Sequence, residues 1–239
     1  MTAEPVVRVT GLRKAFGAHR VLDGVTLDVR GGEAVALLGA NGAGKTTLLR
    51  ILATLTRPSR GTATVLGHDC AAAPERVRPH IGLLGHGACV YEDLTALENL
   101  RFWTALQGLR TDGAALAGAL AAVELERFAG ERVRTLSAGM KRRLAIARLV
   151  LARPRVLLLD EPFAGLDQRA KKWLEGFLEG LKVAGAAMLM AGHSFGRELA
   201  VADRIVVLAA GAIALDTPRG ALDADEIARL YRQHAEEGA

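Results

Sequence analysis

The sequence has little cysteine, few aromatic residues and no long hydrophobic run. Cys70 and Cys89 are too few and too isolated for a disulfide framework or a zinc site. The longest apolar stretches, 183–192 and 205–215, fall short of the roughly 18 residues that a membrane-spanning helix needs. The first residues include an acidic side chain and no apolar segment, unlike a secretory signal. We therefore expect a chain that stays in the cytoplasm and does not cross the membrane itself.

The composition is that of a folded protein with a sizeable core. Half of the 239 residues are hydrophobic, which argues against a disordered chain. The net charge of +5 would permit contact with nucleic acid or anionic lipid, but the basic residues are spread along the chain rather than gathered in a tail. Charge alone therefore points to no particular partner.

The first forty residues alternate between apolar and polar positions, as in Val7 and Val9 and again over 21–29. This period predicts short antiparallel strands. The continuous apolar run at 34–38 predicts a strand buried on both faces of a sheet, and a helix is expected over about 44–53.

Helical periods then replace the strand pattern between Asp93 and Arg153, which predicts a helical subdomain inserted into the sheet. The helices are expected at 97–107, 114–123 and 139–152, and strands return at 155–159, 187–191 and 204–208. The alternation of strands and helices indicates a mostly parallel α/β sheet. A capping pattern from Asp223 predicts a short C-terminal amphipathic helix.

A phosphate-binding loop follows the buried strand directly. The segment 39–46 fits G-x-x-x-x-G-K-[S/T] at every fixed position. Glycines let backbone N–H groups converge on phosphate oxygens, while a lysine and a helix N-terminus supply positive charge. A threonine hydroxyl can bind Mg²⁺. We therefore expect ATP and Mg²⁺ here, with the nucleotide contacted by Gly39, Asn41, Gly42, Gly44, Lys45, Thr46 and Thr47.

Two adjacent carboxylates end the apolar run 156–159. An open α/β sheet presents its ligands at the carboxyl ends of its strands. Neighbouring residues in extended chain point in opposite directions, so Asp160 suits the metal and Glu161 suits the general base. His193 also follows an apolar strand, where a neutral imidazole could sense a γ-phosphate, although a lone histidine is more often structural.

The segment 136–140, Leu-Ser-Ala-Gly-Met, resembles the LSGGQ signature of ABC ATPases, with Ala138 in place of glycine and Met140 in place of glutamine. Together with the motifs above, the resemblance extends over residues 5–217. It implies a head-to-tail dimer with a second copy or a homologous ATPase subunit, in which each ATP lies between one P-loop and the partner's Ser137 and Gly139. Ser137 can cap the helix that follows it.

Further roles are carried over residue by residue. Phe16 matches the aromatic residue that stacks on adenine, although it could be a strand-end core residue, and Asp167 matches the aspartate that communicates across the dimer. His86 replaces the usual glutamine, which puts a metal role for it in doubt. The cations at 141–143 form either a solvated face or part of the dimer seam and trans anion site.

The resemblance implies a P-loop NTPase fold of ABC ATPase type, with an antiparallel N-terminal β-subdomain and integral membrane permease partners. We expect one ABC ATPase domain over 1–239, with the α/β core at 1–86 and 154–215, the helical subdomain at 87–153 and a helical tail at 216–239. The protein would lie at the cytoplasmic face of the membrane and would contact neither its cargo nor nucleic acid.

The segments 85–86, 93–103 and 193–195 look most like the ATP-binding subunit of the haem exporter of cytochrome c maturation. The alternative is an exporter of drugs, antibiotics or polysaccharides. A nucleic-acid machine with this ATPase head would need a long coiled coil or a second cassette, and the sequence between Lys45 and Ser137 has no heptads. A P-loop kinase would have no use for the signature.

Overall fold

The structure is a computed structural model that describes residues 4–220, except for 86, 88 and 193–196, together with Glu226 and Arg229. Its strands are β1 (Val7–Phe16), β2 (His19–Val29), β3 (Ala34–Leu38), β4 (Arg60–Val65), β5 (His68–Asp69), β6 (Ile81–Leu84), β7 (Val156–Asp160), β8 (Ala187–Gly192), β9 (Arg204–Ala209) and β10 (Ala212–Pro218). Its α-helices are α1 (Lys45–Leu52), α2 (Pro74–Val77), α3 (Ala96–Leu106), α4 (Gly113–Ala122), α5 (Ala138–Ala152), α6 (Gln168–Val183) and α7 (Glu198–Val201), and the 3₁₀ helices are η1 (Arg78–His80), η2 (Glu126–Phe128) and η3 (Val133–Thr135).

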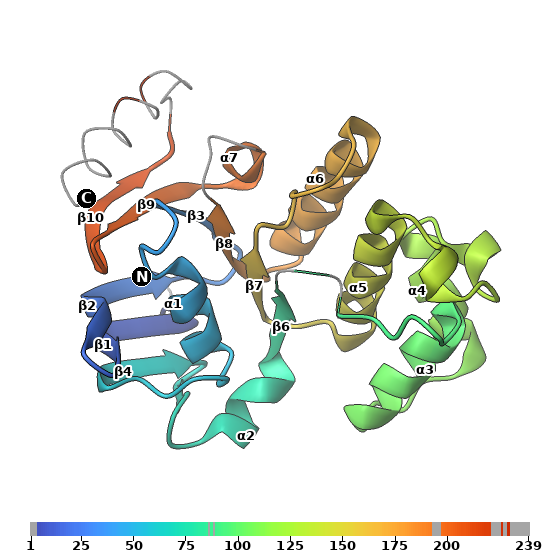
Figure 1. Cartoon of the computed structure of the whole chain (residues 1–239), viewed down its shortest axis with the longest axis horizontal. Helices are drawn as coiled ribbons and strands as arrows, with labels where there is room; N and C mark the ends of the chain where they lie inside the picture. Colours follow the sequence, from blue (N-terminus) through green and yellow to red (C-terminus); the bar gives the residue numbers. More distant parts are fainter. Residues whose placement is uncertain are drawn as a thin grey trace.

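Two sheets form the body of the molecule (Figure 1). The larger has the strand order β10-β9-β3-β8-β7-β6, in which β9, β3, β8, β7 and β6 are parallel and β10 pairs antiparallel with β9. The smaller is antiparallel, with the order β2-β1-β4-β5. The P-loop fold and the antiparallel N-terminal sheet predicted from the sequence are therefore confirmed.

The central strands of the large sheet divide their side chains between two hydrophobic cores. In β3, Ala34, Ala36 and Leu38 pack in one core, whereas Val35 and Leu37 pack in the other. Strand β7 alternates in the same way, because successive side chains of a strand point to opposite faces. Both faces of these strands are thus covered, which explains the unbroken apolar runs in the sequence.

Helices α3, α4 and α5 form a separate lobe beside β6 and β7 (Figure 1). Each helix begins at a residue whose side chain accepts a backbone N–H: Thr95 for α3, Asp112 for α4 and Ser137 for α5. Such caps satisfy N–H groups that have no partner within the helix. The side chain of Ser137 caps its helix as the sequence predicts, accepting from Met140 N at 3.3 Å.

The four core strands predicted from the sequence and the three lobe helices agree with the structure to within one residue at each end, whereas β6 and β10 of the large sheet were not predicted. The proposed division of the chain into core, helical subdomain and tail stays a prediction. Most of the C-terminal helix predicted from Asp223 lies outside the described residues. Among the helices that the structure describes, none combines the length and the apolar character needed to cross a membrane.

Candidate nucleotide site

The turn between β3 and α1 depends on Gly44, which has a φ of 105°. A Cβ at this residue would lie 2.6 Å from Leu22 Cδ2 and 2.8 Å from Val21 O. Only glycine fits both the backbone conformation and this close packing against β2. Gly44 is the N-cap residue of α1 and provides no side-chain cap, so the first N–H groups of this helix are left for an anion.

Lys45 begins α1 with a side chain that is only 7% exposed. Its ammonium donates to Gly39 O at 2.7 Å and to Ala40 O at 2.9 Å, so it lies inside the curve of the loop. Burial lowers the pKa of Lys45, and the negative charges of Glu161 and Asp160 oppose that shift. The loop therefore holds a buried cation next to two carboxylates, where phosphate oxygens would balance it.

Thr46 and Asp160 meet across the sheet edge. Thr46 Oγ1 donates to Asp160 Oδ2 at 2.9 Å, which joins the start of α1 to the end of β7. A hydroxyl and a carboxylate are hard oxygen donors of the kind that Mg²⁺ binds, usually together with waters and substrate phosphates. The pair therefore fits a magnesium ion bound together with a nucleotide, as the sequence predicts.

Glu161 follows Asp160 in a left-handed backbone conformation, with a φ of 48°. Its backbone N–H donates to Ala191 O at 2.9 Å, and its carbonyl accepts from Ala164 N at 3.1 Å. This turn directs the chain out of the sheet at the strand end, and the half-buried Glu161 lines the same cleft as Lys45 and Thr46. The structure thus brings Lys45, Thr46, Asp160 and Glu161, all of them predicted site residues, to one edge of the sheet.

The cleft has a volume of about 270 Å³. Its lining comprises His19, Val21, Asn41, Gly42, Gly44, Lys45, Thr46, Thr47 and Glu161. His19 and Val21 come from β2 and were not predicted from the sequence. The signal was available, because the predicted adenine-stacking residue Phe16 lies just before the β1–β2 turn that leads to His19.

Phe16 is 54% exposed, which excludes the alternative of a strand-end core residue. The ammonium of Lys14 lies 4.7 Å from the centre of its ring. Gly39, in contrast, is buried at the end of β3, where a Cβ would collide with the carbonyl oxygen of Leu208. Gly39 therefore allows β3 and β9 to pack closely beneath the loop.

A second cleft, of about 490 Å³, lies at the start of α5. Ser137, Gly139 and Asp167 all line it, and Asp167 also caps α6 by accepting from Ala170 N at 2.7 Å. The lining of this cleft has no residue in common with the first one. The P-loop and the signature segment of one chain thus face two different clefts.

The three cations of the signature helix differ in their surroundings. Lys141 pairs with Glu92 at 2.5 Å, and Arg143 pairs with Glu124 at 2.6 Å while its guanidinium stacks on Trp173. Arg142 is only 7% exposed, which excludes the alternative of a solvated face for this residue. Its guanidinium points into the sheet edge instead. His86 and His193, both predicted as site residues, lie outside the described residues.

Residues 22–164 match the family model described as ABC transporter. This segment contains the loop, the strand-end carboxylates and the signature described above. The chain belongs to the ABC transporter family. In this family the ATP-binding domain binds ATP with Mg²⁺ and is an ATP hydrolase, and its subunits work as dimers with membrane permease partners.

The ABC transporter relatives include curated proteins that share more than a third of their aligned residues with this chain. This chain is 38% identical over 229 residues to the daunorubicin/doxorubicin resistance ATP-binding protein DrrA of Streptomyces peucetius. The alignment covers 93% of this chain and 68% of that protein. It is 36% identical over 206 residues to the Nod factor export ATP-binding protein I of Ralstonia nicotianae, covering 85% and 64%.

A solved structure described as an ATP binding subunit of an ABC transporter matches with a TM-score of 0.84 and 30% identity, covering 94% of this chain and 99% of that one. These comparisons support the ABC ATPase assignment but do not support the resemblance to the haem exporter. They favour the alternative of an exporter of drugs, antibiotics or polysaccharides, because the DrrA relatives are named for daunorubicin or doxorubicin resistance and the Ralstonia protein is named for Nod factor export.

Proposed function

We propose that the chain is the ATP-hydrolysing subunit of an ABC exporter and that it works at the cytoplasmic face of the membrane. Lys45 and the N-terminal N–H groups of α1 bind the phosphates, and Thr46 and Asp160 hold Mg²⁺. A magnesium ion held by these two side chains would supply neutralisation of the phosphate charge. Glu161 accepts a proton from the attacking water, and His193 senses the γ-phosphate.

A single observation carries this assignment: the hydrogen bond of 2.9 Å between Thr46 and Asp160, at the edge of a cleft that Lys45 and Glu161 also line. The pair Lys45 and Thr46 lies far along the chain from the pair Asp160 and Glu161, since Thr46 and Asp160 are 114 positions apart. Phosphate binding, metal binding and a base thus meet at one sheet edge, which is what phosphoryl transfer to water requires.

The dimer that we propose is head to tail. The signature residues Ser137 and Gly139 face a cleft that is separate from the P-loop cleft of the same chain. A second copy would place its signature over the P-loop of the first, so that each ATP is bound by two subunits. Asp167, at the rim of the signature cleft, would lie near that seam.

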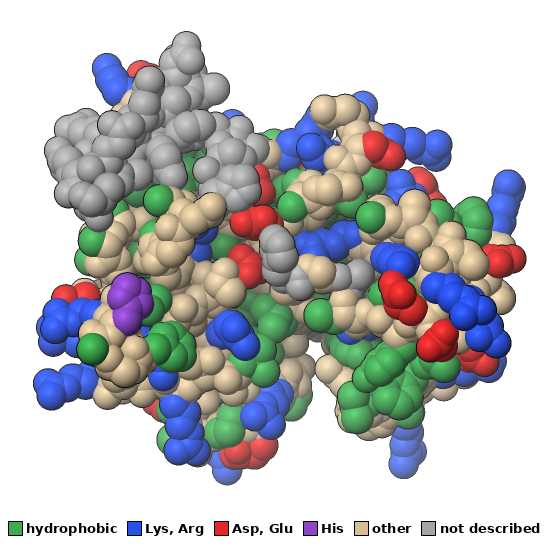
Figure 2. Space-filling view, viewed as in Figure 1, with side chains coloured by type: hydrophobic (Ala, Val, Ile, Leu, Met, Phe, Trp, Pro, Cys, Tyr) green, Lys and Arg blue, Asp and Glu red, His purple; other side chains and the backbone are tan. Residues whose placement is uncertain are grey.

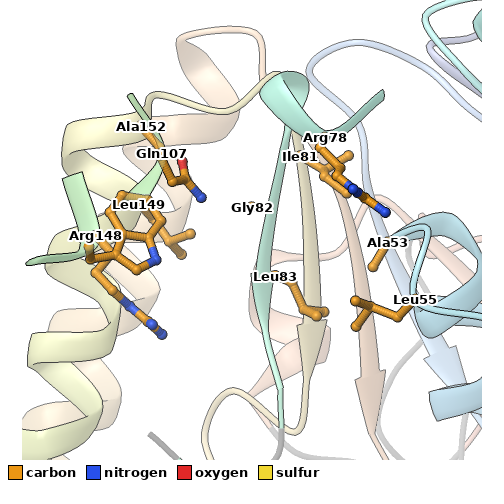
Figure 3. Close-up of a pocket in the computed structure, with 11 residues that line it drawn as sticks. Ala53, Leu55, Arg78, Ile81, Gly82, Leu83, Gln107, Arg148, Leu149 and Ala152 are labelled. Atoms are coloured by element: carbon orange, nitrogen blue, oxygen red, sulfur yellow. The ribbon is translucent and has the colours of Figure 1, made fainter. Parts of the chain in front are cut away.

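A groove between the sheet and the helical lobe suits the permease. It has a volume of about 270 Å³ and is lined mainly by apolar side chains from the segment that follows α1 and from β6, α3 and α5, with Arg78 on one side and Arg148 on the other (Figure 3). Large apolar side chains are exposed nearby on α3, where Phe102 is 43% and Leu106 is 71% exposed, and Figure 2 shows hydrophobic side chains gathered at that place. Exposed apolar patches of this kind mark protein interfaces.

We propose that this groove receives a cytoplasmic helix of the permease and that the cargo is a drug or antibiotic. The cargo proposal rests on relatives that are named for drug resistance. Because the cargo passes through the permease, no residue of this chain is assigned to it. Inverted membrane vesicles that contain this chain and the membrane subunits encoded beside it should take up doxorubicin when ATP is added. Doxorubicin uptake that does not depend on ATP, or ATP hydrolysis without any doxorubicin uptake, would rule out doxorubicin as the cargo.

Substitution Glu161→Gln tests the hydrolytic mechanism. The variant should bind Mg-ATP with unchanged affinity in an equilibrium titration but release phosphate about a hundredfold more slowly, the usual scale for the loss of a general base. Glu175→Gln, on α6, is a matched control, because its carboxylate pairs with Arg197 outside the cleft. Hydrolysis by the Glu161→Gln protein at the wild-type rate would show that another group activates the water.

A further inference from the structure

Arg142 is a buried cation that links the helical lobe to the edge of the sheet. It lies in the second turn of α5, and its side chain reaches away from the lobe toward the end of β7. The residue is 7% exposed. A buried guanidinium is costly unless its N–H groups find acceptors, so the contacts that it makes decide what it does.

The acceptors are four backbone carbonyls on two segments. Nη1 donates to Gly85 O at 2.7 Å and to Gly87 O at 3.2 Å, in the segment that leaves β6. Nη2 donates to Asp160 O at 3.2 Å and to Glu161 O at 3.1 Å. One planar group therefore holds Gly85 and Gly87, beyond the end of β6, and at the same time Asp160 and Glu161 of the cleft.

The charge of Arg142 strengthens these bonds. Burial lowers the pKa of Arg142, and the negative charge of Asp160 opposes that shift; a guanidinium keeps its proton in proteins. Its fork of donors can serve four carbonyls at once, whereas the compact ammonium of a lysine cannot. The contact is therefore specific for arginine and not merely for a positive charge.

Glu161 is the residue that most needs such support. Its φ of 48° is a strained conformation for a residue with a side chain, and such strain persists only where the surroundings determine it. Among the described residues, its N–H donates to Ala191 O, and its carbonyl accepts from Ala164 N and from Arg142. Two of these partners belong to the sheet and its exit turn, and the third belongs to the helical lobe.

We propose that Arg142 is a positioning residue that holds the Glu161 backbone in its strained turn and makes that turn depend on the placement of α5, Gly85 and Gly87. The inference rests on the proposed role of Glu161 as the general base. Any displacement of α5 relative to the sheet would therefore reach the base through this guanidinium, without a contact to ATP. Arg142 thus affects the rate of hydrolysis rather than the affinity for nucleotide.

Substitution Arg142→Met in the full chain should lower kcat for ATP about tenfold or more, while KM and the equilibrium affinity for Mg-ATP stay within about twofold, since a small displacement of a reacting group costs rate rather than binding. Arg204→Met is the matched control. Arg204 is a half-buried arginine that donates to Asp28 O and pairs with Glu33 and Asp216. The Arg204→Met variant should lose about as much thermal stability as Arg142→Met but keep the wild-type kcat. An unchanged kcat in Arg142→Met would overturn the proposal.

Arg142→Lys keeps the charge and is the second variant if Arg142→Met does not fold. It should lose less activity than Arg142→Met, again in kcat alone. A wild-type kcat in the lysine variant would show that the positive charge suffices. It would refute the proposal that hydrolysis needs the contact of the guanidinium with four carbonyls. An increase in KM with no change in kcat would also refute it.

A double variant separates this inference from the proposed function. When Glu161 is already glutamine, adding Arg142→Met should cost little further kcat, because both changes act through one group. A further loss as large as in the wild-type background would show that Arg142 acts elsewhere. If Glu161→Gln alone hydrolyses ATP at the wild-type rate, Glu161 is not the general base. This conclusion does not depend on the role of Arg142.

Discussion

The N-termini of α1 and α3 are built in opposite ways. Helix α3 closes its own end: Thr95 Oγ1 accepts from Glu98 N at 3.2 Å, and the Glu98 carboxylate accepts from Thr95 N at 2.8 Å. Helix α1 begins at Gly44, which provides no side-chain cap, and its first turn carries Lys45 and no acidic residue. A helix that supports the lobe has thus satisfied its N–H groups internally, whereas the helix at the nucleotide cleft leaves them for a ligand.

Helix α5 combines the two arrangements. Ser137 caps it in the manner of Thr95, but its first turn has no acidic residue and its N-terminus faces an open cleft. The comparison of these three N-termini suggests that a helix end intended for an anion can be distinguished by its missing carboxylate. Three experiments would test that difference.

The largest effect is expected at the uncapped end. Lys45→Ala removes the buried ammonium, and loss of a charged hydrogen bond to phosphate costs about 3 kcal/mol, or roughly a hundredfold in affinity. Binding of Mg-ATP should therefore be about a hundredfold weaker in an equilibrium titration. Lys172→Ala, an exposed lysine of α6, is the control and should bind normally. Unchanged affinity in Lys45→Ala would show that α1 does not bind the phosphates.

A smaller effect separates the caps of α5 and α3. Ser137→Ala and Thr95→Ala should each lower the free energy of unfolding by about 1 kcal/mol, the usual value of an N-cap. Only Ser137→Ala should also lower phosphate release, by about tenfold or more, if its hydroxyl acts on a transition state across the dimer. Equal turnover of the two variants, measured at a protein concentration that permits dimerisation, would make Ser137 a structural cap and nothing more.

The smallest effect concerns pH. Hydrogen bonds from the backbone and side chain of Thr95 lower the pKa of Glu98, so its charged form is stabilised in the folded protein. The stability that it contributes is present above its unfolded pKa and is lost as the pH falls through the lowered, folded value. The difference in free energy of unfolding between wild type and Glu98→Gln should therefore vanish in acid, as chemical denaturation at several pH values would reveal. If the difference in free energy of unfolding persists in acid, it arises from the packing of Glu98 and not from its charge.

Much of the fold was predictable because its signals are local. The buried strand β3 and the helices of the lobe follow from apolar periods within the sequence, and their bounds agree closely with the structure. Strand β4, with the sequence Arg-Gly-Thr-Ala-Thr-Val, and the two-residue β5 were not predicted. Their short, largely polar segments become strands through pairing with β1 and with each other, which no local pattern reveals.

The site follows the same rule. The P-loop and the pair Asp160 and Glu161 are contiguous motifs, so both the residues and their meeting at one sheet edge could be predicted. The contacts of Arg142 could not, because its carbonyl partners Gly85 and Gly87 lie 57 and 55 residues away. Any acceptor along the chain could have served a guanidinium, and only the packing of α5 on the sheet selects these.

The backbone of Glu161 has a φ of 48°. Glycine can adopt this φ at almost no steric cost, whereas for a residue with a side chain the conformation costs about 1–2 kcal/mol of stability. Either glutamate codon becomes a glycine codon by one base change. Mutation therefore has a short route from the present chain to a more stable protein without the carboxylate. Selection for stability alone would favour that route at position 161, so the glutamate can persist only while the organism gains from turnover.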